Sequence, residues 1–198
     1  MNKKLVLKLS EIGAVKFGAF TLKSGMVSPI YIDLRLLVSY PGLLKIVAKE
    51  MKKKLDALRY DRIAGIPYAA LPIATALSLL INKPMIYTRK EQKEYGTKKL
   101  IEGEYKSGET AVVIDDLVTT AKSKFGAIEP LLAEGLVVKD IVVLIDREQG
   151  GREQLLEKGY NLHACLPLKK MLKFLLKEGK MDRQKYGEVL DFLKANKA

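Results

Sequence analysis

The chain has 198 residues, 48% of them apolar, which is enough for a single domain with a substantial hydrophobic core. One cysteine and one histidine exclude an internal disulfide framework and multi-histidine zinc sites. The net charge of +12 admits a polyanionic partner, but the lysines are scattered along the chain, which favours solubility as their role over nucleic-acid binding.

The N-terminal stretch predicts a helix followed by a small hood of strands. Residues 3–12 carry apolar side chains at helical spacing. Residues 13–35 alternate apolar and polar side chains and are punctuated by glycines, which is typical of short strands joined by turns.

From residue 41 onward, predicted strands alternate with predicted helices. The strands are expected at 62–67, 83–89, 110–115, 140–146 and 162–168. The helices are expected at 41–58, 69–80, 122–134 and 150–158, with two lysine-rich helices in 169–198. Residues 90–109 are polar and glycine-containing, which predicts a loop and a hairpin. This alternation predicts an α/β fold with a parallel sheet flanked by helices.

We therefore interpret residues 1–198 as a single domain with a hood at about 1–40, a core at about 41–168 and C-terminal helices at 169–198. The basic N-terminus lacks the apolar core and cleavage site of a signal peptide. No apolar run reaches the roughly 18 residues of a membrane span. We expect a cytoplasmic protein that binds neither membranes nor nucleic acid.

Three predicted strands end in polar or special residues, at 65–68, at 115–116 and at 146–148. Ligands of open α/β sheets bind beyond the carboxyl ends of the strands. We therefore expect these three strand ends to converge on one crevice.

The stretch 112–124, VVIDDLVTTAKSK, combines an acid pair with a helix start. Asp115 and Asp116 can accept hydrogen bonds from sugar hydroxyls or face a metal ion. The amides of a helix N-terminus bind phosphate. Hydroxyls and cations follow the acids at Thr119, Thr120, Lys122, Ser123 and Lys124. Helix capping explains one of these residues, whereas a sugar-phosphate site explains the combination.

This stretch resembles the phosphoribosyl-pyrophosphate (PRPP) motif of type I phosphoribosyltransferases. Other stretches, in order along nearly the whole chain, are similar to orotate phosphoribosyltransferase. They are FTLKSGMVSPIYID (20–33), GIPYAALPIAT (65–75), RKEQKEYGTKKLIEGEY (89–105) and VLIDREQGG (143–151). The resemblance is greatest to the form that is fused to a decarboxylase in UMP synthases.

The resemblance implies the type I phosphoribosyltransferase fold and the conversion of orotate and PRPP into orotidine 5′-monophosphate and pyrophosphate. It implies Mg²⁺ as cofactor, held mainly by PRPP near Asp115 and Asp116, with no side chain assigned as a direct ligand. It also implies a homodimer in which the Arg89–Lys93 loop reaches the neighbouring subunit's site. An association with a separate orotidine monophosphate decarboxylase is a further expectation.

The resemblance also assigns residues. Those implied to bind PRPP are Lys23, Tyr68, Ala69, Arg89, Lys90, Lys93, Tyr95, Asp115, Asp116, Leu117, Val118, Thr119, Thr120, Ala121, Lys122 and Ser123. Those implied to bind orotate are Lys23, Tyr31, Ile32, Thr119 and Arg147. The implied catalytic residues are Lys23, Lys93, Asp115 and Asp116.

The sequence departs from the family pattern at Ala121 and Lys122, where relatives usually have a glycine and a small residue. Either the loop uses an ordinary φ, with Lys122 pointing outward or binding phosphate, or PRPP binding is weakened. Ala69 and Tyr95 stand where many relatives have lysine and histidine.

For several of these residues, a purely structural role is an alternative interpretation. Residues 89–93 fit a solvated loop, Lys23 fits a surface hairpin, and Tyr31 and Ile32 fit core positions of a strand. Arg147 fits a surface ion pair with Glu148. At the level of function, the alternatives are a phosphoribosyltransferase for another base and a PRPP-binding regulator.

Overall fold

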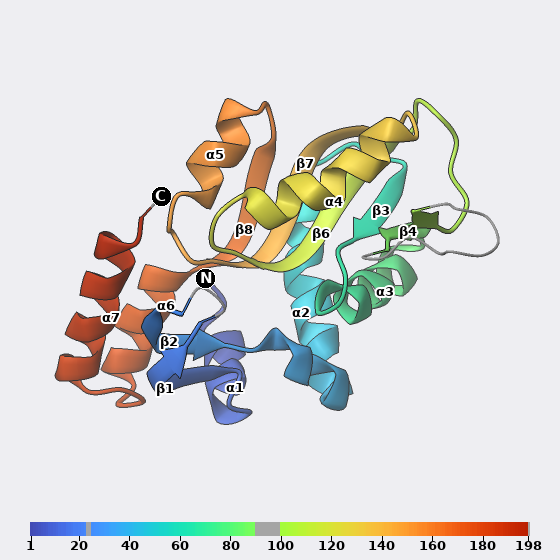
Figure 1. Ribbon diagram of the computed structural model, residues 1–198. Helices are drawn as coiled ribbons and strands as arrows, with labels where there is room; N and C mark the ends of the chain where they lie inside the picture. The colour runs from blue at the N-terminus through green and yellow to red at the C-terminus, as the bar shows by residue number, and fades with distance from the viewer. Residues whose placement is uncertain (23–24, 90–99, 198) are drawn as a thin grey trace.

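The structure, a computed structural model, describes residues 1–22, 25–89 and 100–197. Its centre is a six-stranded sheet in the order β5-β4-β3-β6-β7-β8 (Figure 1). The strands are β3 (Arg62–Gly65), β4 (Met85–Thr88), β5 (Ile101–Glu102), β6 (Thr110–Val118), β7 (Val137–Asp146) and β8 (Asn161–Pro167).

All neighbouring strands of this sheet are parallel except the short edge strand β5, which pairs antiparallel with β4. The predicted parallel sheet is therefore confirmed. A hairpin was predicted within residues 90–109; β5 lies in this stretch, but it pairs with β4, which precedes it, and residues 90–99 lie outside the described residues. Next to this pair, the Arg89 amide donates a hydrogen bond to the Leu100 carbonyl at 2.8 Å.

Helices cover both faces of the sheet (Figure 1). One face packs on α2 (Pro41–Leu55) and α3 (Ala70–Ile81), and the other on α4 (Lys122–Ala133) and α5 (Gly151–Glu157). Successive residues of β6 alternate between the two clusters, since Val112 belongs to the first and Val113 to the second. This two-sided burial explains why the strands read as nearly continuous apolar runs.

The strand β6 is longer than the sequence predicts. It was expected to end at Asp115, but it pairs with β7 as far as Val118, which lies opposite Asp146. The ten-residue neighbour β7 offers backbone partners along this whole length, so the acids do not interrupt the ladder. As a result, Asp115 and Asp116 lie inside the strand.

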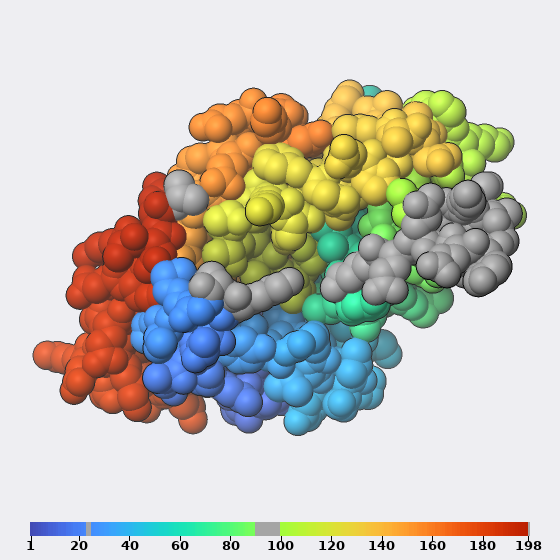
Figure 2. Space-filling view, in the orientation of Figure 1, coloured from blue at the N-terminus to red at the C-terminus, as the bar shows by residue number. Residues whose placement is uncertain are grey.

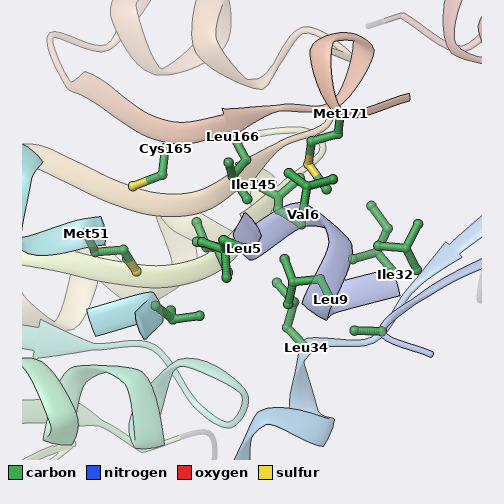
Figure 3. Close-up of a cluster of buried hydrophobic side chains, with 14 of the residues drawn as sticks. Leu5, Val6, Leu9, Ile32, Leu34, Met51, Ile145, Cys165, Leu166 and Met171 are labelled. Atoms are coloured by element: carbon green, nitrogen blue, oxygen red, sulfur yellow. The ribbon is translucent and has the colours of Figure 1, made fainter. Parts of the chain in front are cut away.

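The predicted hood is present. The helix α1 (Lys3–Glu11) precedes an antiparallel pair, β1 (Val15–Thr21) and β2 (Val27–Ile32), and the short 3₁₀ helix η1 (Leu34–Ser39) follows. Figure 3 shows Leu5, Val6 and Leu9 of α1 between hood residues and sheet residues such as Leu166. The helix α1 therefore joins the hood to the sheet through a shared apolar core.

The two C-terminal helices, α6 (Leu168–Lys177) and α7 (Arg183–Ala195), dock on the same core. The helix α6 contacts α1, and α7 lies against β2. Their buried residues are Leu168, Met171, Leu172, Phe174, Leu175, Val189 and Leu193. In the described ranges, every helix is too short or too polar to span a bilayer.

The shared core predicts that the hood depends on α1. Leu5→Ala removes a fully buried side chain and is expected to lower the free energy of unfolding by about 2–5 kcal/mol. Leu156→Ala is the matched control because Leu156 is 65% exposed, and its effect should stay within about 0.5 kcal/mol. Urea unfolding of both variants is the measurement. Equal effects would contradict the role given to α1.

Candidate active site

A cavity of about 510 Å³ opens at the carboxyl ends of β3, β4 and β6, beside the start of α4. Figure 2 shows the surface hollowed between the α4 segment and the hood. The lining residues are Ile66, Pro67, Ala69, Thr88, Arg89, Asp115, Asp116, Leu117, Ser123, Lys124, Gly126 and Ala127. Two of the three expected strand ends therefore meet there, whereas the end of β7 is not part of this lining.

Asp115 is almost fully buried and forms an ion pair with the equally buried Lys124 of α4. Its second carboxylate oxygen, Oδ1, accepts a hydrogen bond from the Asp116 amide at 2.8 Å. The Asp116 Oδ1 in turn accepts from the Leu117 amide at 2.8 Å. Both acids are thus held by local contacts at one wall of the cavity.

The two acids differ in their electrostatic environment. Burial, followed by repulsion from the neighbouring Asp115 carboxylate, raises the pKa of Asp116 to about 7. The Leu117 amide and the Lys124 ammonium oppose this rise. Asp116 therefore exchanges a proton near neutral pH.

The loop between β6 and α4 adopts ordinary backbone angles. Ala121 has φ −79° and is fully buried, so the alanine brings no left-handed strain. Lys122 is exposed at the first position of α4. Of the alternatives left open by the sequence, the structure supports the ordinary φ with an outward-facing Lys122.

This loop is tied to the start of α5. The Ala121 amide donates to Oε1 of Gln154 at 2.9 Å, and the Gly151 amide donates to the Thr119 carbonyl at 3.2 Å. A Cβ at Gly151 would lie 2.6 Å from Val118 Cγ2, so only glycine permits this close approach. The role of Gln154 was missed because nothing in the sequence links it to a loop 33 residues earlier.

The turn between β3 and α3 forms another wall of the cavity through Pro67 and Ala69. Tyr68 is 65% exposed beside it. The helix α3 begins without a side-chain cap at Ala69. Its first amides can therefore act as donors to an anion.

Arg89 also lines the cavity, and its Nη1 donates to Oε1 of Glu102 at 2.9 Å. This ion pair fixes the guanidinium at the start of the β4–β5 hairpin. Four other residues of the expected site, Lys23, Lys90, Lys93 and Tyr95, lie outside the described residues.

Arg147 is 8% exposed and follows the end of β7. Within the described part of the chain, its Nε and Nη2 have no hydrogen-bond partner. Burial lowers the pKa of its guanidinium. The surface ion pair with Glu148 is wrong, because the Glu148 carboxylate accepts instead from the Lys169 amide at 2.7 Å. A buried cation with open donors is suited to a planar anionic ligand.

The two hood residues expected near orotate have different environments. The Tyr31 hydroxyl accepts from Nη2 of Arg35 at 2.9 Å, and its ring stacks on Phe20 with centroids 5.4 Å apart. Ile32 is buried in the apolar core around Leu9 (Figure 3). The core interpretation therefore holds for the Ile32 side chain, while its backbone remains part of the hood.

The family resemblance did not include Lys124 among the site residues, whereas the residue pattern of 112–124 named it as a candidate cation of the sugar-phosphate site. The structure brings its ammonium to Asp115 in the cavity wall. A second omitted residue is Thr88, a buried hydroxyl in the cavity wall.

Comparison with known proteins places this site in a family. No family model matches the chain. It is 42% identical to the orotate phosphoribosyltransferase of Pyrococcus abyssi over 168 residues, which is 84% of this chain and 92% of that protein. The chain belongs to the orotate phosphoribosyltransferase family.

Longer relatives of the orotate phosphoribosyltransferase family match as well. Uridine 5′-monophosphate synthase of Bos taurus is 42% identical over 97% of this chain and 40% of its own length. The structure of Leishmania donovani UMP synthase matches with a TM-score of 0.91 and 47% identity, over 98% of this chain and 42% of that one. The chain thus spans about two-fifths of these relatives, and the predicted type I phosphoribosyltransferase fold is confirmed.

The raised pKa of Asp116 predicts a pH-dependent stability. The folded protein keeps a proton on Asp116 that the unfolded chain releases near pH 4, so this contribution is complete below about pH 4 and is lost as the pH rises to about 7. The free energy of unfolding of the unliganded wild type should therefore fall between about pH 4.5 and 7.5, relative to that of Asp116→Asn, by on the order of a few kcal/mol.

Thermal unfolding across this pH range is the measurement. Asp191→Asn is the control, because the Asp191 side chain is 80% exposed and should leave the wild-type pH profile unchanged. Parallel profiles for wild type and Asp116→Asn would contradict the assigned environment of Asp116.

Proposed function

We propose that the chain transfers the phosphoribosyl group of PRPP to orotate, giving orotidine 5′-monophosphate and pyrophosphate in pyrimidine biosynthesis. One observation carries the proposal. The Asp115–Asp116 pair faces a cavity at the start of α4 in a member of the orotate phosphoribosyltransferase family.

The acid pair serves the sugar in this proposal. Asp115 and Asp116 accept hydrogen bonds from the ribose hydroxyls and place negative charge beside the ring. As the bond from the anomeric carbon to the diphosphate oxygen breaks, that carbon becomes cationic, and the carboxylates stabilise it. The departing bond's electron pair leaves with pyrophosphate.

The turn 119–123 receives the 5-phosphate. The first amides of α4, a twelve-residue helix, point toward this turn, and Thr119, Thr120 and Ser123 add hydroxyl donors. The ties to Gln154 and Gly151 support this role because they hold the turn in one conformation.

Arg147 recognises the base. Orotate is a flat ring with a carboxylate, and the open donors of a buried guanidinium match its geometry. The hood residues Tyr31 and Ile32 close the base side of the site. Orotate is already an anion, so its ring nitrogen can form the new bond to the anomeric carbon without a general base.

The oxygen donors of this cavity are compatible with Mg²⁺ that binds together with the substrate. The carboxylates of Asp115 and Asp116 are hard oxygen donors, which suit this ion. Among the described residues, no group of three or more His, Cys, Asp or Glu side chains gathers to hold a metal. In this proposal, Mg²⁺ would be held mainly by the PRPP oxygens near the acid pair, and it would neutralise charge on the diphosphate.

The remaining cations act on the leaving group. We propose that Lys23, Arg89, Lys90 and Lys93 stabilise the departing pyrophosphate, with Tyr68, Ala69 and Tyr95 beside it. In the active form, a cytoplasmic homodimer, the 89–93 loop serves the neighbouring subunit. We also propose that the protein associates with an orotidine monophosphate decarboxylase, because relatives named UMP synthase are more than twice as long.

An absorbance assay tests the proposed reaction. Purified protein is mixed with PRPP, Mg²⁺ and orotate, and parallel reactions contain uracil, hypoxanthine or adenine. Only orotate should be consumed, and Asp116→Asn should lower its turnover while remaining folded. Consumption of another base would redirect the assignment. No turnover, combined with sequence-selective nucleic-acid retention at rising salt, would support a regulator instead.

Sharing of the loop across the dimer predicts complementation. Lys93→Ala and Arg147→Ala should each be nearly inactive alone. After unfolding and refolding together, random heterodimers contain one intact site each, so the mixture should reach about a quarter of wild-type activity. Activity that stays at the level of the separate variants would exclude a loop acting on the partner's site.

A further inference from the structure

Lys124 is a buried lysine in the first turn of α4. Its side chain is 5% exposed, and it lines the cavity described above. Its Nζ forms an ion pair with Asp115 Oδ2 and donates to Ser123 Oγ at 3.2 Å.

This position is costly for a cation on two counts. Lysine is almost never buried without a partner of opposite charge. The N-terminus of a helix also carries a partial positive charge, which disfavours an ammonium group in the first turn. Burial and the helix dipole both disfavour the Lys124 ammonium at this position. The ion pair with Asp115 offsets these unfavourable effects.

The contact fixes the orientation of the Asp115 carboxylate. The Lys124 ammonium contacts one carboxylate oxygen, Oδ2, and the Asp116 amide donates to the other, Oδ1. A carboxylate has about four acceptor positions, and these two contacts leave others for a ligand.

We propose that Lys124 is a positioning residue that holds the Asp115 carboxylate in the orientation of an acceptor for a ribose hydroxyl. The inference rests on the proposed function, in which the acid pair binds the sugar. It assigns Lys124 to the recognition of the pentose hydroxyls, through Asp115, and not to the binding of the phosphate.

Calorimetry with two sugar phosphates separates this role from a structural one. Wild type should bind ribose 5-phosphate more tightly than 2,3-dideoxyribose 5-phosphate, which lacks both ring hydroxyls. Lys124→Met should reduce this preference about tenfold, because a misoriented Asp115 loses its hydrogen bond to the ribose hydroxyl. Affinity for the dideoxy compound should change little. Equal weakening for both sugars would overturn the inference, since it would indicate a general loss of structure or a phosphate contact.

Two further variants complete the test. Lys139→Met is the control, because Lys139 is an exposed lysine on β7, and it should keep the wild-type preference. Lys124→Met leaves a buried carboxylate without its partner and is at risk of unfolding. The double variant Asp115→Asn, Lys124→Met removes both charges, so it should fold and show the same reduced preference. A double variant with the wild-type preference would overturn the inference.

The outcomes also separate this inference from the proposed function. If wild type selects ribose 5-phosphate through Lys124 but consumes no orotate, the proposed reaction fails and the positioning role stands. If wild type converts orotate and Lys124→Met keeps the full hydroxyl preference, the positioning role fails alone.

Discussion

The ion pair between Asp115 and Lys124 is the interaction on which the cavity depends. It joins the central strand β6 to the first turn of α4, and both partners are almost fully buried. An isolated charge at this depth would cost several kcal/mol, so each partner makes the other tolerable. The pair also distinguishes two neighbouring acids, since Asp115 contacts the Lys124 ammonium directly, whereas burial and the nearby Asp115 carboxylate raise the pKa of Asp116 to about 7.

The charges around the cavity are arranged for a ligand that carries both hydroxyls and anionic groups. Acids line the wall formed by β6, and the uncapped start of α3 offers amide donors on another wall. At the end of β7, outside the lining of this cavity, Arg147 is buried, and its Nε and Nη2 have no hydrogen-bond partner among the described residues. Such a distribution favours a phosphorylated sugar and a planar carboxylate over an apolar ligand.

Much of the fold could be predicted from the sequence because its signals are local. Apolar runs bounded by glycine and proline located the strands, and the alternation with helices predicted the parallel sheet. The end of β6 was misplaced because a ladder with β7 outweighs the low strand propensity of aspartate. The buried state of Arg147 could not be predicted either, since burial depends on contacts between elements that are distant in the sequence.

The contacts that residues 147–154 make with residues 118–121 have a thermodynamic consequence. Val118 accepts from the Arg147 amide, Thr119 from the Gly151 amide, and Ala121 donates to Gln154. Folding has therefore already restricted the rotations of this turn, and a ligand that arrives there gives up little further chain entropy. A glycine-rich turn would lose backbone conformational entropy when the ligand binds. Here that entropy is already lost on folding, because residues about thirty positions downstream hold the turn.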